Sequence, residues 1–544
     1  MKKVLIIGSG ISGMSCAVKC AEFGMQVTLV SPYPSERSQS VMAAGGINAV
    51  TGEHNEEDSV VSHIEDTLKG GAWLAGKKAV TGLCEGAGDI IRYLESIGTV
   101  FSVDSNGRPM VRAFGGQSHK RTHYCGASTG KQIVSALVME ARRYEGAGSI
   151  VRLLRRHFHS ALIKDGRCYG ALLFNEDSGK LEDTHADFLV VATGGMNSLF
   201  GKTTGSLLCD GYAAGKLFMQ GAVLKNLEFI QYHPTTMETG QKRMLISEAV
   251  RGEGGRLFYN ENGKRVYFME DKYGPKGNLM TRDVVAREIE ATKKEVFLDI
   301  SFMDKKLIDS RLSEVRDLCK KYRGIDISKE PIPVAPSVHF FMGGLAVHLD
   351  HETSIRNLFA VGECASIYHG ANRLGGNSLL AAVYSGITCA SAISERKESG
   401  DTPDFKDYVE KEEKALESIT DDKSPFPAVY IRNILADIMQ TNLGIVRSGE
   451  NMKKGMADVD YYLSVSDRIK YDAGVSAYAA YSLKGILAAA RATLSCALAR
   501  KESRGAHLRS DFPEESEAYA CATLISYDGG GFNVKFDKEK AYEN

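Results

Sequence analysis

The chain has no Cys-x-x-Cys pair. Its 11 cysteines are scattered and never take the spacing typical of zinc and iron–sulfur sites. We therefore expect no metal in this chain, and reduced thiols favour a cytoplasmic protein. Cys16 and Cys20 lie one turn apart in a predicted helix, on a face that we expect to be buried.

Long apolar runs are also missing from the sequence. No stretch reaches the roughly 18 apolar residues that span a bilayer, so we expect no direct membrane span. The run Val4–Ile7 near the N-terminus is too short for the apolar part of a signal peptide, and we expect none.

Neither sign of charge is in excess. Lysine and arginine number 67, and aspartate and glutamate 68, for a net charge of -1, which argues against a surface for nucleic acid or anionic lipid. Proline is scarce, at 12 residues, whereas glycine reaches 56. This pattern is typical of tight strand-to-helix turns around a nucleotide rather than of disorder. At 544 residues the chain is too long for one core, and we expect two to four domains.

The first 30 residues predict a dinucleotide-binding unit. A buried strand, Val4–Ile7, leads into Gly8-Ser9-Gly10-Ile11-Ser12-Gly13, a helical run to Phe23 and a second strand, Gln26–Val30. The glycines allow a tight turn and bring a pyrophosphate close to the helix N-terminus. Ser31 stands where an acidic residue usually binds the ribose of a nicotinamide cofactor, so a flavin dinucleotide is the better fit.

Two later strands indicate that this unit is split along the chain. One, Phe188–Val191, runs into glycines, and the other is Leu358–Val361. An insertion from about 225 to 337 separates them. From Pro403 the sequence becomes charged and helical, with amphipathic runs at 406–417, 427–441 and 474–500. A polar tail with little regular pattern is expected after Glu502.

The most specific segment is Gly370–Leu380. Arg373 is a planar, bidentate clamp for a carboxylate, and the two glycines after Leu374 let backbone approach a ligand closely. Asn377 and Ser378 then open an apolar helix whose N-terminal N–H groups suit an anion or a carbonyl. This is the chemistry needed to hold a carboxylate against a cofactor.

Several collinear motifs carry a resemblance that covers the whole chain. The chain resembles the flavoprotein subunits of succinate dehydrogenase and fumarate reductase, a superfamily that includes L-aspartate oxidase. Besides the N-terminal glycine turn, the matching segments are Ala44–Asn48, Ala192–Gly195, His233–Thr235, Ser247–Gly255, Arg282–Arg287, His339 with Met342–Gly344, Gly362-Glu363, His369–Leu380, Glu502–His507 and Asp511–Pro513.

The resemblance implies an α/β fold in several parts. These are a split Rossmann-like FAD-binding domain (1–224 and 338–398), an inserted α+β capping domain (225–337), a helical domain (399–503) and a C-terminal tail (504–544). It also implies hydride transfer between flavin N5 and a four-carbon dicarboxylate, fumarate or succinate, in a site between the first two domains.

The substrate and proton-transfer residues follow from the same motifs. His339 and Arg373 would hold one carboxylate, His233 and Ser247 the other. Arg287 would move the proton, relayed by Glu248 and Arg251. Arginine is a poor acid by its ordinary pKa, and without the resemblance Glu248 or a histidine would be the preferred acid.

The cofactor implied is FAD. The residues expected to contact it are Gly8, Gly10, Ser12, Gly13, Ser31, Ser38, Gln39, Ser40, Ala44, Gly45, Gly46, Ala192, Thr193, Gly194, Asp210, Glu363, Arg373, Asn377, Ser378 and Leu379. Gln39 stands where the membrane-bound enzymes have the histidine that carries the covalent flavin bond. Glutamine cannot form that bond, so we expect FAD to be non-covalent and the enzyme to favour fumarate reduction.

Two alternatives stay open at this point. L-aspartate oxidase would place a glutamate near the substrate ammonium, at the position of Phe114, and phenylalanine offers no charge. An FAD-binding tRNA-modification protein would need a basic surface, which the charge balance disfavours. For the dicarboxylate enzymes we expect the electron partner to be a separate iron–sulfur protein. The chain would then be cytoplasmic, or peripheral at the membrane through partner subunits.

Overall fold

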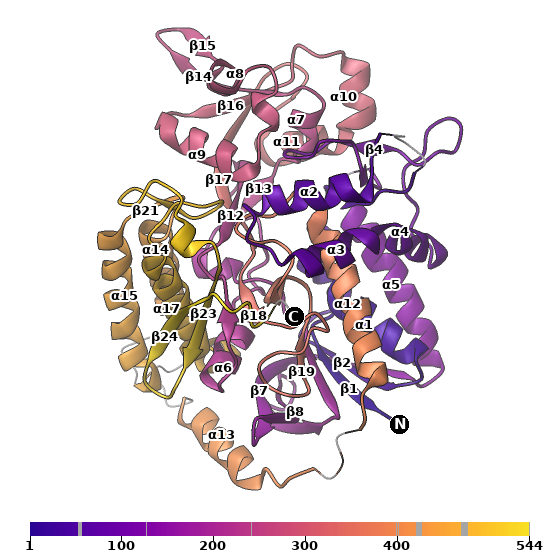
Figure 1. Ribbon diagram of the computed structural model, residues 1–544, viewed down its shortest axis with the longest axis vertical. Coiled ribbons are helices and arrows are strands. Elements are labelled where there is room, and N and C mark those ends of the chain that lie inside the picture. The colour runs from indigo at the N-terminus through magenta and orange to yellow at the C-terminus, as the bar shows by residue number, and fades with distance from the viewer. Residues whose placement is uncertain are drawn as a thin grey trace.

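The computed structural model describes residues 1–52, 57–126, 128–240, 242–398, 400, 402–419, 427–468 and 477–542. Figure 1 shows three parts around a common centre: a nucleotide-binding unit built mainly from the N-terminal half, a capping unit at one end, and a helical unit beside them. Residue 399, the expected start of the helical domain, lies outside the described residues, as do positions 474–476 and 543–544.

A parallel five-stranded sheet forms the base of the nucleotide-binding unit. Its strand order is β19-β10-β1-β2-β6, with all neighbours parallel. These strands are β1 (Lys3–Ile7), β2 (Gln26–Ser31), β6 (Ile150–Leu154), β10 (Phe188–Val191) and β19 (Leu358–Ala360). Strands that are far apart in the sequence therefore pair directly, and the split predicted from 188–191 and 358–361 is confirmed.

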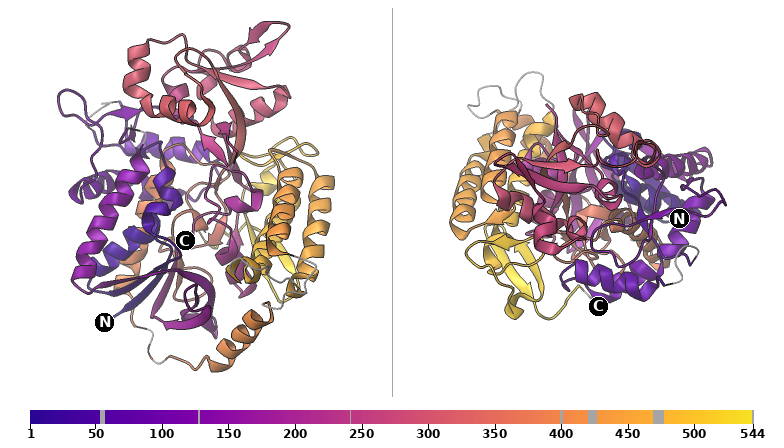
Figure 2. Two further views of the ribbon diagram at one scale, coloured as in Figure 1. Left: turned by 180° about the vertical axis from the view of Figure 1, so that it is seen from behind. Right: turned by 90° about the horizontal axis from the view of Figure 1, so that it is seen from above.

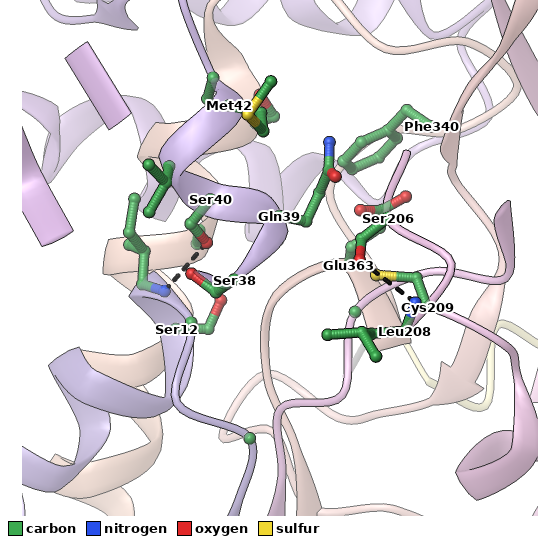
Figure 3. A pocket seen from close by; sticks show the side chains of 18 of the residues that line it. Ser12, Ser38, Gln39, Ser40, Met42, Ser206, Leu208, Cys209, Phe340 and Glu363 are labelled. Carbon is green, nitrogen blue, oxygen red and sulfur yellow. Dashed lines mark hydrogen bonds between the residues drawn. The ribbon is translucent and has the colours of Figure 1, made fainter. Parts of the chain in front are cut away.

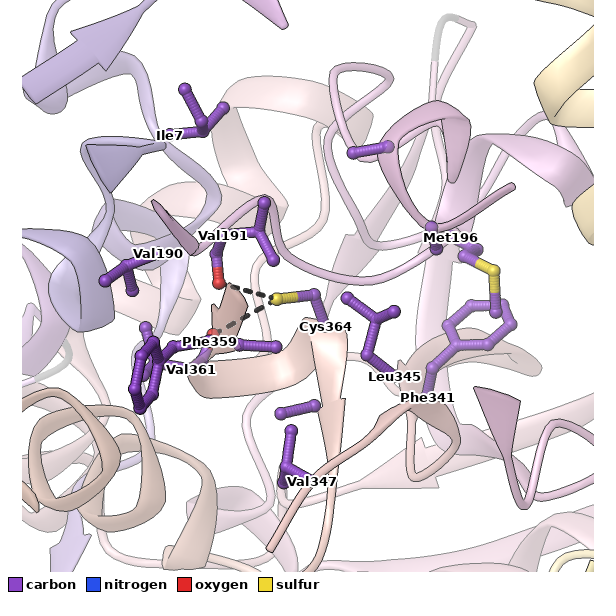
Figure 4. Packing of buried hydrophobic residues seen from close by; sticks show 14 of the residues in the cluster. Ile7, Val190, Val191, Met196, Phe341, Leu345, Val347, Phe359, Val361 and Cys364 are labelled. Carbon is purple, nitrogen blue, oxygen red and sulfur yellow. Dashed lines mark hydrogen bonds between the residues drawn. The ribbon is translucent and has the colours of Figure 1, made fainter. Parts of the chain in front are cut away.

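The strands β1, β10 and β19 are buried on both faces, as is typical of a parallel sheet. Helix α1 (Ile11–Glu22) packs against α5 (Thr129–Gly146) and α12 (Asn377–Glu395). Figure 4 shows apolar side chains of β1, β10 and β19 packed in the core, with the Cys364 thiol donating to the Val191 and Val361 carbonyls at 3.2 Å. Cys16 and Cys20 are fully buried in α1, as predicted.

Smaller elements complete the nucleotide-binding unit. They are the sheet β7 (Arg156–Lys164), β8 (Arg167–Asn175) and β9 (Lys180–His185), the sheet β3 (Ile47–Asn48), β5 (Thr122–His123) and β4 (Val111–Arg112), and helices α2 (Val60–Gly70), α3 (Lys77–Glu85), α4 (Ala87–Ser96) and α6 (Tyr212–Met219). Short 3-10 turns lie at Ser35–Arg37, Gln39–Met42, Asn197–Phe200, Gly277–Leu279, Gly362–Cys364, Ser466–Arg468 and Glu517–Tyr519.

The capping unit is a six-stranded antiparallel sheet with its own core. The strand order is β13-β12-β17-β16-β14-β15. These strands are β12 (Ile230–Glu238), β13 (Arg243–Leu245), β14 (Arg256–Glu261), β15 (Lys264–Val266), β16 (Val296–Asp299) and β17 (Ile332–Phe341), and the helices are α7 (Ala249–Gly252), α8 (Phe268–Tyr273), α9 (Arg282–Thr292), α10 (Lys305–Arg311) and α11 (Ser313–Arg323). Its apolar cluster is separate from the main core. Figure 2 shows this unit at one end of the molecule from behind as well.

The helical unit contains α13 (Lys406–Ser418), α14 (Ala428–Asn442), α15 (Gly449–Ser464), α16 (Ala477–Tyr481) and α17 (Leu483–Ala499). Its segment Ala477–Ala499 is long and apolar enough to cross a membrane, so the prediction that no stretch reaches that length is wrong. However, 78% of its apolar window is buried inside the protein, and α17 packs against α6 and α15. Those contacts are typical of a core helix.

The C-terminal segment corrects a second prediction. Instead of an irregular tail, it forms a hairpin of β23 (Ala522–Tyr527) and β24 (Phe532–Asp537), and β23 pairs with β11 (Leu224–Lys225). The resulting sheet continues through β18 (Gly344–Ala346) to β20 (Ala365–Ser366). The signals were a short apolar run and the glycine-rich turn Asp528–Gly531. A two-residue pair, β21 (Val446–Arg447) and β22 (Leu508–Arg509), lies nearby.

Arg500, just after α17, ties this hairpin to the rest of the molecule. It is fully buried, and Nε donates to Glu228 Oε1 at 2.6 Å. Its two terminal nitrogens donate to Glu502 Oε1 and to three acceptors on the C-terminal segment, the Tyr519 and Cys521 carbonyls and Thr523 Oγ1, at 2.6–2.8 Å. The guanidinium thus bonds through every nitrogen it has.

We expect Arg500→Met to lower the free energy of unfolding by about 3–5 kcal/mol, because it removes the buried cation that faces the Glu228 and Glu502 carboxylates and takes one donor from each of its other acceptors. The urea midpoint, followed by circular dichroism, measures this loss. Arg108→Met is the matched control, since Arg108 is exposed. Equal midpoints for the two variants would contradict a structural role for Arg500.

Candidate active site

One cavity of about 450 Å³ runs from the glycine turn of the nucleotide-binding unit to the inner surface of the capping unit. Most predicted site residues line it. These are Gly8, Gly10, Ser12, Ser31, Ser38, Gln39, Ser40, Ala44, Gly45, Gly46, Phe114, Ala192, Thr193, Gly194, Asp210, His233, Ser247, Glu248, His339, Glu363, Arg373, Ser378 and Leu379. Gly13, Arg251, Arg287 and Asn377 do not line it.

The glycine turn is built for close approach. Gly8 has φ +110°, and a side chain there would collide with the Ala192 carbonyl oxygen. Gly13 packs against the turn itself: a side-chain carbon there would collide with the Gly8 carbonyl. Its role is to let α1 pack onto the turn, rather than to contact a ligand. The α1 N-terminus therefore points at the cavity, as pyrophosphate binding requires.

Asn377 has a supporting role as well. It is fully buried, and its side chain bonds Asn48, His63 and Thr67, beneath α12. The amide thereby holds the first turn of α12, while the next two residues, Ser378 and Leu379, line the cavity. The prediction that Asn377 contacts the cofactor is wrong in this geometry, because these three partners take its polar atoms.

Two walls face each other at the middle of the cavity. Figure 3 shows Ser38, Ser40 and Met42 on one side and Ser206, Leu208 and Cys209 on the other. Ser40 Oγ accepts from the Ile11 N–H at 3.1 Å, which fixes the segment carrying Gln39 against α1. Sequence reasoning missed Cys209, and the signal available was only its place next to Asp210.

Glu363 is a buried carboxyl group on this cavity. Its Oε1 accepts from the Phe341 N–H at 3.0 Å. Burial raises the pKa of Glu363 to about 7, although the Phe341 N–H and the charge of Arg373 act in the opposite direction. Small changes in pH around neutrality therefore shift Glu363 between its neutral and its charged form.

At the capping end, two histidines lie together. The rings of His233 and His339 are 5.2 Å apart and nearly perpendicular. His339 Nδ1 lies 2.8 Å from Thr204 Oγ1, and His233 Nδ1 lies 3.1 Å from the Thr235 carbonyl oxygen. Burial, followed by the charge of Arg282, lowers the pKa of both histidines well below the usual value. Both are thus neutral hydrogen-bonding groups.

Arg373 is buried next to them. Its guanidinium lies 4.4 Å from the centre of the Phe340 ring, and its Nη2 donates to Gln231 Oε1 at 2.9 Å. Burial and then the charge of Arg282 lower the pKa of Arg373. An anion bound at this point would relieve that destabilisation. Sequence reasoning missed Phe340 and Gln231, which neighbour the predicted His339 and His233.

Arg282 is the functional residue that sequence reasoning misplaced. It lines the cavity, is 8% exposed, and donates from Nε and Nη2 to Glu248 Oε2 at 2.9 and 2.8 Å. Its Nη1 donates to Gln231 Oε1 at 3.1 Å, so one amide oxygen serves both Arg282 and Arg373. Arg251 lies behind, with Nη2 3.3 Å from Glu248 Oε1.

Glu248 is ionised in this arrangement. Burial alone would raise its pKa, but the charges of Arg282 and Arg251, with hydrogen bonds from Arg282 and the Gly115 N–H, lower the pKa of Glu248 to about 2. Three guanidinium groups, on Arg251, Arg282 and Arg373, therefore gather around one permanent carboxylate. This excess of positive charge suits a ligand that carries two negative charges.

Arg287, by contrast, lies outside this cavity. It sits five residues after Arg282 in α9, which is about 140° around the helix. Its side chain is 41% exposed, near Glu288 and the Tyr273 hydroxyl. A group that faces away from the ligand cannot deliver a proton to it. The prediction that Arg287 moves the proton is therefore wrong in this structure, because helix geometry turns that position outward.

The residues fit a flavin dinucleotide. The glycine turn at the α1 N-terminus suits a pyrophosphate, and the cavity continues past it to the buried arginines. Several buried polar atoms of cavity residues have no hydrogen-bond partner within the described protein: Ser38 Oγ, His233 Nε2 and Arg373 Nε. Such atoms are expected where a polar ligand completes the site.

Comparison with known proteins agrees with this geometry. A family described as "FAD binding domain" matches residues 3–379, and one described as "Fumarate reductase flavoprotein C-term" matches residues 432–542. The chain is 36% identical to the succinate dehydrogenase flavoprotein subunit of Bacillus subtilis, covering 94% of this chain and 92% of that one. It is 34% identical to a fumarate reductase (CoM/CoB) subunit of Methanothermobacter marburgensis, covering 96% of both.

Solved structures are similar along the full length. The E. coli quinol fumarate reductase flavoprotein, FrdA, superposes with a TM-score of 0.90 at 29% identity, covering 98% of this chain and 97% of that one. Sdh1 of Mycobacterium smegmatis superposes with a TM-score of 0.85 at 26% identity, covering 98% and 94%. These matches do not favour the aspartate oxidase alternative. The chain belongs to the succinate dehydrogenase and fumarate reductase flavoprotein family, and is an FAD-dependent oxidoreductase of that type.

Proposed function

We propose that this protein interconverts fumarate and succinate and works faster as a fumarate reductase. The observation that carries the substrate assignment is the pair of buried arginines, Arg282 and Arg373, that share the Gln231 amide oxygen. A linear dicarboxylate supplies a negative charge for each end of such a site, and the neutral histidines add hydrogen bonds without adding charge.

Each carboxylate has a matched set of donors in this proposal. Arg373 and His339 hold one end. His233 and Ser247 hold the other, with His233 Nε2 free to face the ligand. Phe114 is 3% exposed and packs between Gly45 and Gly375, where it excludes water from the site. Bound FAD would supply the hydride chemistry at its flavin ring.

Arg282 is the proton donor in this proposal, in place of Arg287. It lines the cavity and is held in one orientation by two hydrogen bonds to Glu248. Glu248 is ionised and has no proton to give, so it orients Arg282 and can accept the proton lost on the reverse path. Arg251 lies on the far side of Glu248 and completes the relay. Arginine is a weak acid, but Arg282 is a cationic donor that lines this end of the cavity and is paired with a carboxylate.

Substrate specificity follows from the same charges. An amino acid such as L-aspartate brings an ammonium group, which Arg251, Arg282 and Arg373 would repel. Phe114 offers no carboxylate to offset that repulsion. We therefore infer that L-aspartate is a poor substrate.

One comparative assay tests the function. Purified protein is assayed for oxidation of a reduced dye by fumarate, and for dye reduction by succinate and by L-aspartate. Fumarate should give the fastest turnover. Aspartate turnover at rates that rival fumarate would overturn the substrate assignment, and so would visible flavin with no turnover of any of the three.

The proton-transfer assignment is tested within α9. Arg282→Ala should lower kcat for fumarate reduction by at least about a thousandfold with flavin still bound, because the donor acts in the transition state. Arg287→Ala is the matched control from the same helix, and its kcat should stay within about threefold of wild type. If Arg287→Ala lowered kcat more than Arg282→Ala did, Arg287 would be the proton donor instead.

The mode of FAD attachment is tested by acid precipitation. Gln39 lines the cavity where the family's covalent histidine would stand, and glutamine forms no such bond. All yellow colour should enter the supernatant, whereas flavin in the protein pellet would contradict non-covalent binding. A histidyl bond raises the flavin potential, so its absence should favour fumarate reduction. Faster succinate oxidation with matched dyes would contradict that bias.

Partners and location complete the proposal. The relatives are named as subunits, and this sequence has no Cys-x-x-Cys pairs for its own iron–sulfur relay. We infer that electrons pass to or from a separate iron–sulfur protein. The chain would work in the cytoplasm, held at the membrane surface through partner subunits.

A further inference from the structure

Asn372 joins the two units that enclose the cavity. Its Nδ2 donates to Asp283 Oδ1 at 3.0 Å, in α9 of the capping unit, and to the Gly70 carbonyl at 3.2 Å, at the end of α2 in the nucleotide-binding unit. Its Oδ1 accepts from Gln231 Nε2 at 2.8 Å. The side chain is 3% exposed. One small amide therefore bonds to three separate elements.

These bonds lead directly to the substrate arginines. Asn372 precedes Arg373, and Asp283 follows Arg282. Gln231 Nε2 also donates to the Arg373 carbonyl at 2.7 Å, while Gln231 Oε1 accepts from both guanidinium groups. The two units are thus connected twice at neighbouring positions, once between side chains Asn372 and Asp283 and once through Gln231. Displacing α9 together with β12, which carries Gln231, would break both connections.

Helix α9 has space on its outer side. A second cavity of about 280 Å³ lies there, lined from α9 by Asp283, Ala286 and Arg287, and across from it by Arg504–Leu508 and Pro513–Glu515. Packed interiors move between discrete arrangements and do not deform continuously. Val285 and Ile289 of α9 belong to the capping core, so a shift of α9 toward the second cavity moves the capping unit with it.

We propose that Asn372 is a positioning residue that latches α9 onto the substrate loop. With the Asn372–Asp283 bond made, Arg282 and Arg373 are held at the distance that the shared Gln231 oxygen sets. With it broken, α9 moves toward the second cavity and Arg282 leaves the substrate. The consequence for turnover rests on the fumarate reductase function proposed above, whereas the latch itself does not.

The central variant is Asn372→Asp. It replaces the donating amide by a carboxylate that faces Asp283 and repels it. We expect the KM for fumarate to rise about tenfold to a hundredfold. The form in which α9 is held against the substrate loop becomes a small fraction of the population, and substrate binding must restore it. At saturating fumarate, kcat should fall much less. Asn372→Asp should thus change KM more than kcat. Arg282→Ala should change kcat more than KM, because it removes the proton donor itself.

A reciprocal exchange supplies the matched control. Asn372→Asp combined with Asp283→Asn restores one donor facing one acceptor, in the reverse order, but not the bond to the Gly70 carbonyl. KM should therefore fall well below that of Asn372→Asp alone. Asp283→Asn alone keeps the oxygen that accepts from Asn372, and it should change KM little. Asp283→Ala removes that acceptor and should raise KM as Asn372→Asp does, which keeps the test decisive if one variant folds poorly.

Hydrogen exchange reads the latch without turnover. In FAD-loaded protein free of substrate, Asn372→Asp should speed amide exchange in α9, Arg282–Thr292, and the reciprocal exchange should reverse it. Helix α11, Ser313–Arg323, is the internal control in the same unit and should not change. If Asn372→Asp had the wild-type KM and the wild-type rate of amide exchange in α9, the latch would be overturned. The same conclusion would follow if the double variant Asn372→Asp with Asp283→Asn kept the full defect of Asn372→Asp. Failure of wild type to reduce fumarate would overturn the proposed function alone.

Discussion

The centre of the molecule is organised by two buried guanidinium groups that share one amide oxygen. Arg282 and Arg373 both donate to Gln231 Oε1, and like charges this close are costly in a dry site unless other groups compensate. Glu248 compensates Arg282, and the Phe340 ring faces Arg373. Burial and the nearby positive charge lower the pKa of His233 and His339, so both histidines are neutral. The remaining positive charge is what makes the cavity receptive to a dianion.

This constraint also explains why the site needs two units. Arg373 and Gly375 come from the nucleotide-binding unit, whereas His233, Glu248 and Arg282 come from the capping unit. Neither unit alone would place opposing groups around a small substrate. In the function proposed above, the position of Arg282 depends on α9, which contacts the loop before α12 through the Asn372–Asp283 hydrogen bond. Polar contacts of this kind can be made and broken with small changes in free energy.

The cofactor end follows different physics. There the requirement is close approach, met by Gly8 and Gly13, at which side chains would collide with backbone. Asn377 does not line the cavity; its side chain bonds Asn48, His63 and Thr67 and so holds the first turn of α12. The segment around Gln39 is held against α1 by the hydrogen bond from the Ile11 N–H to Ser40 Oγ. Flavin binding thus depends on backbone shape, while substrate binding depends on buried charge.

The sequence by itself determined the features that depend on local order. The turn Gly8–Gly13 between two strands, the buried strands 188–191 and 358–361, the inserted capping segment and the placement of Arg373 at the cavity all follow from residue type and spacing. These signals are readable because strand, turn and helix patterns repeat within a few residues. Most of the site residues predicted on that basis and through the resemblance line the cavity.

Only the tertiary structure decided which residues meet. The motif 282–287 contains two arginines, and the side of α9 that faces the cavity selects Arg282 over Arg287. Gln231 and Asn372 act through partners more than 50 residues away in sequence. The hairpin β23–β24 was missed because its pairing strand, β11, lies about 300 residues earlier. Likewise, composition cannot tell the core segment 477–499 from a membrane span, because the difference lies in what surrounds it.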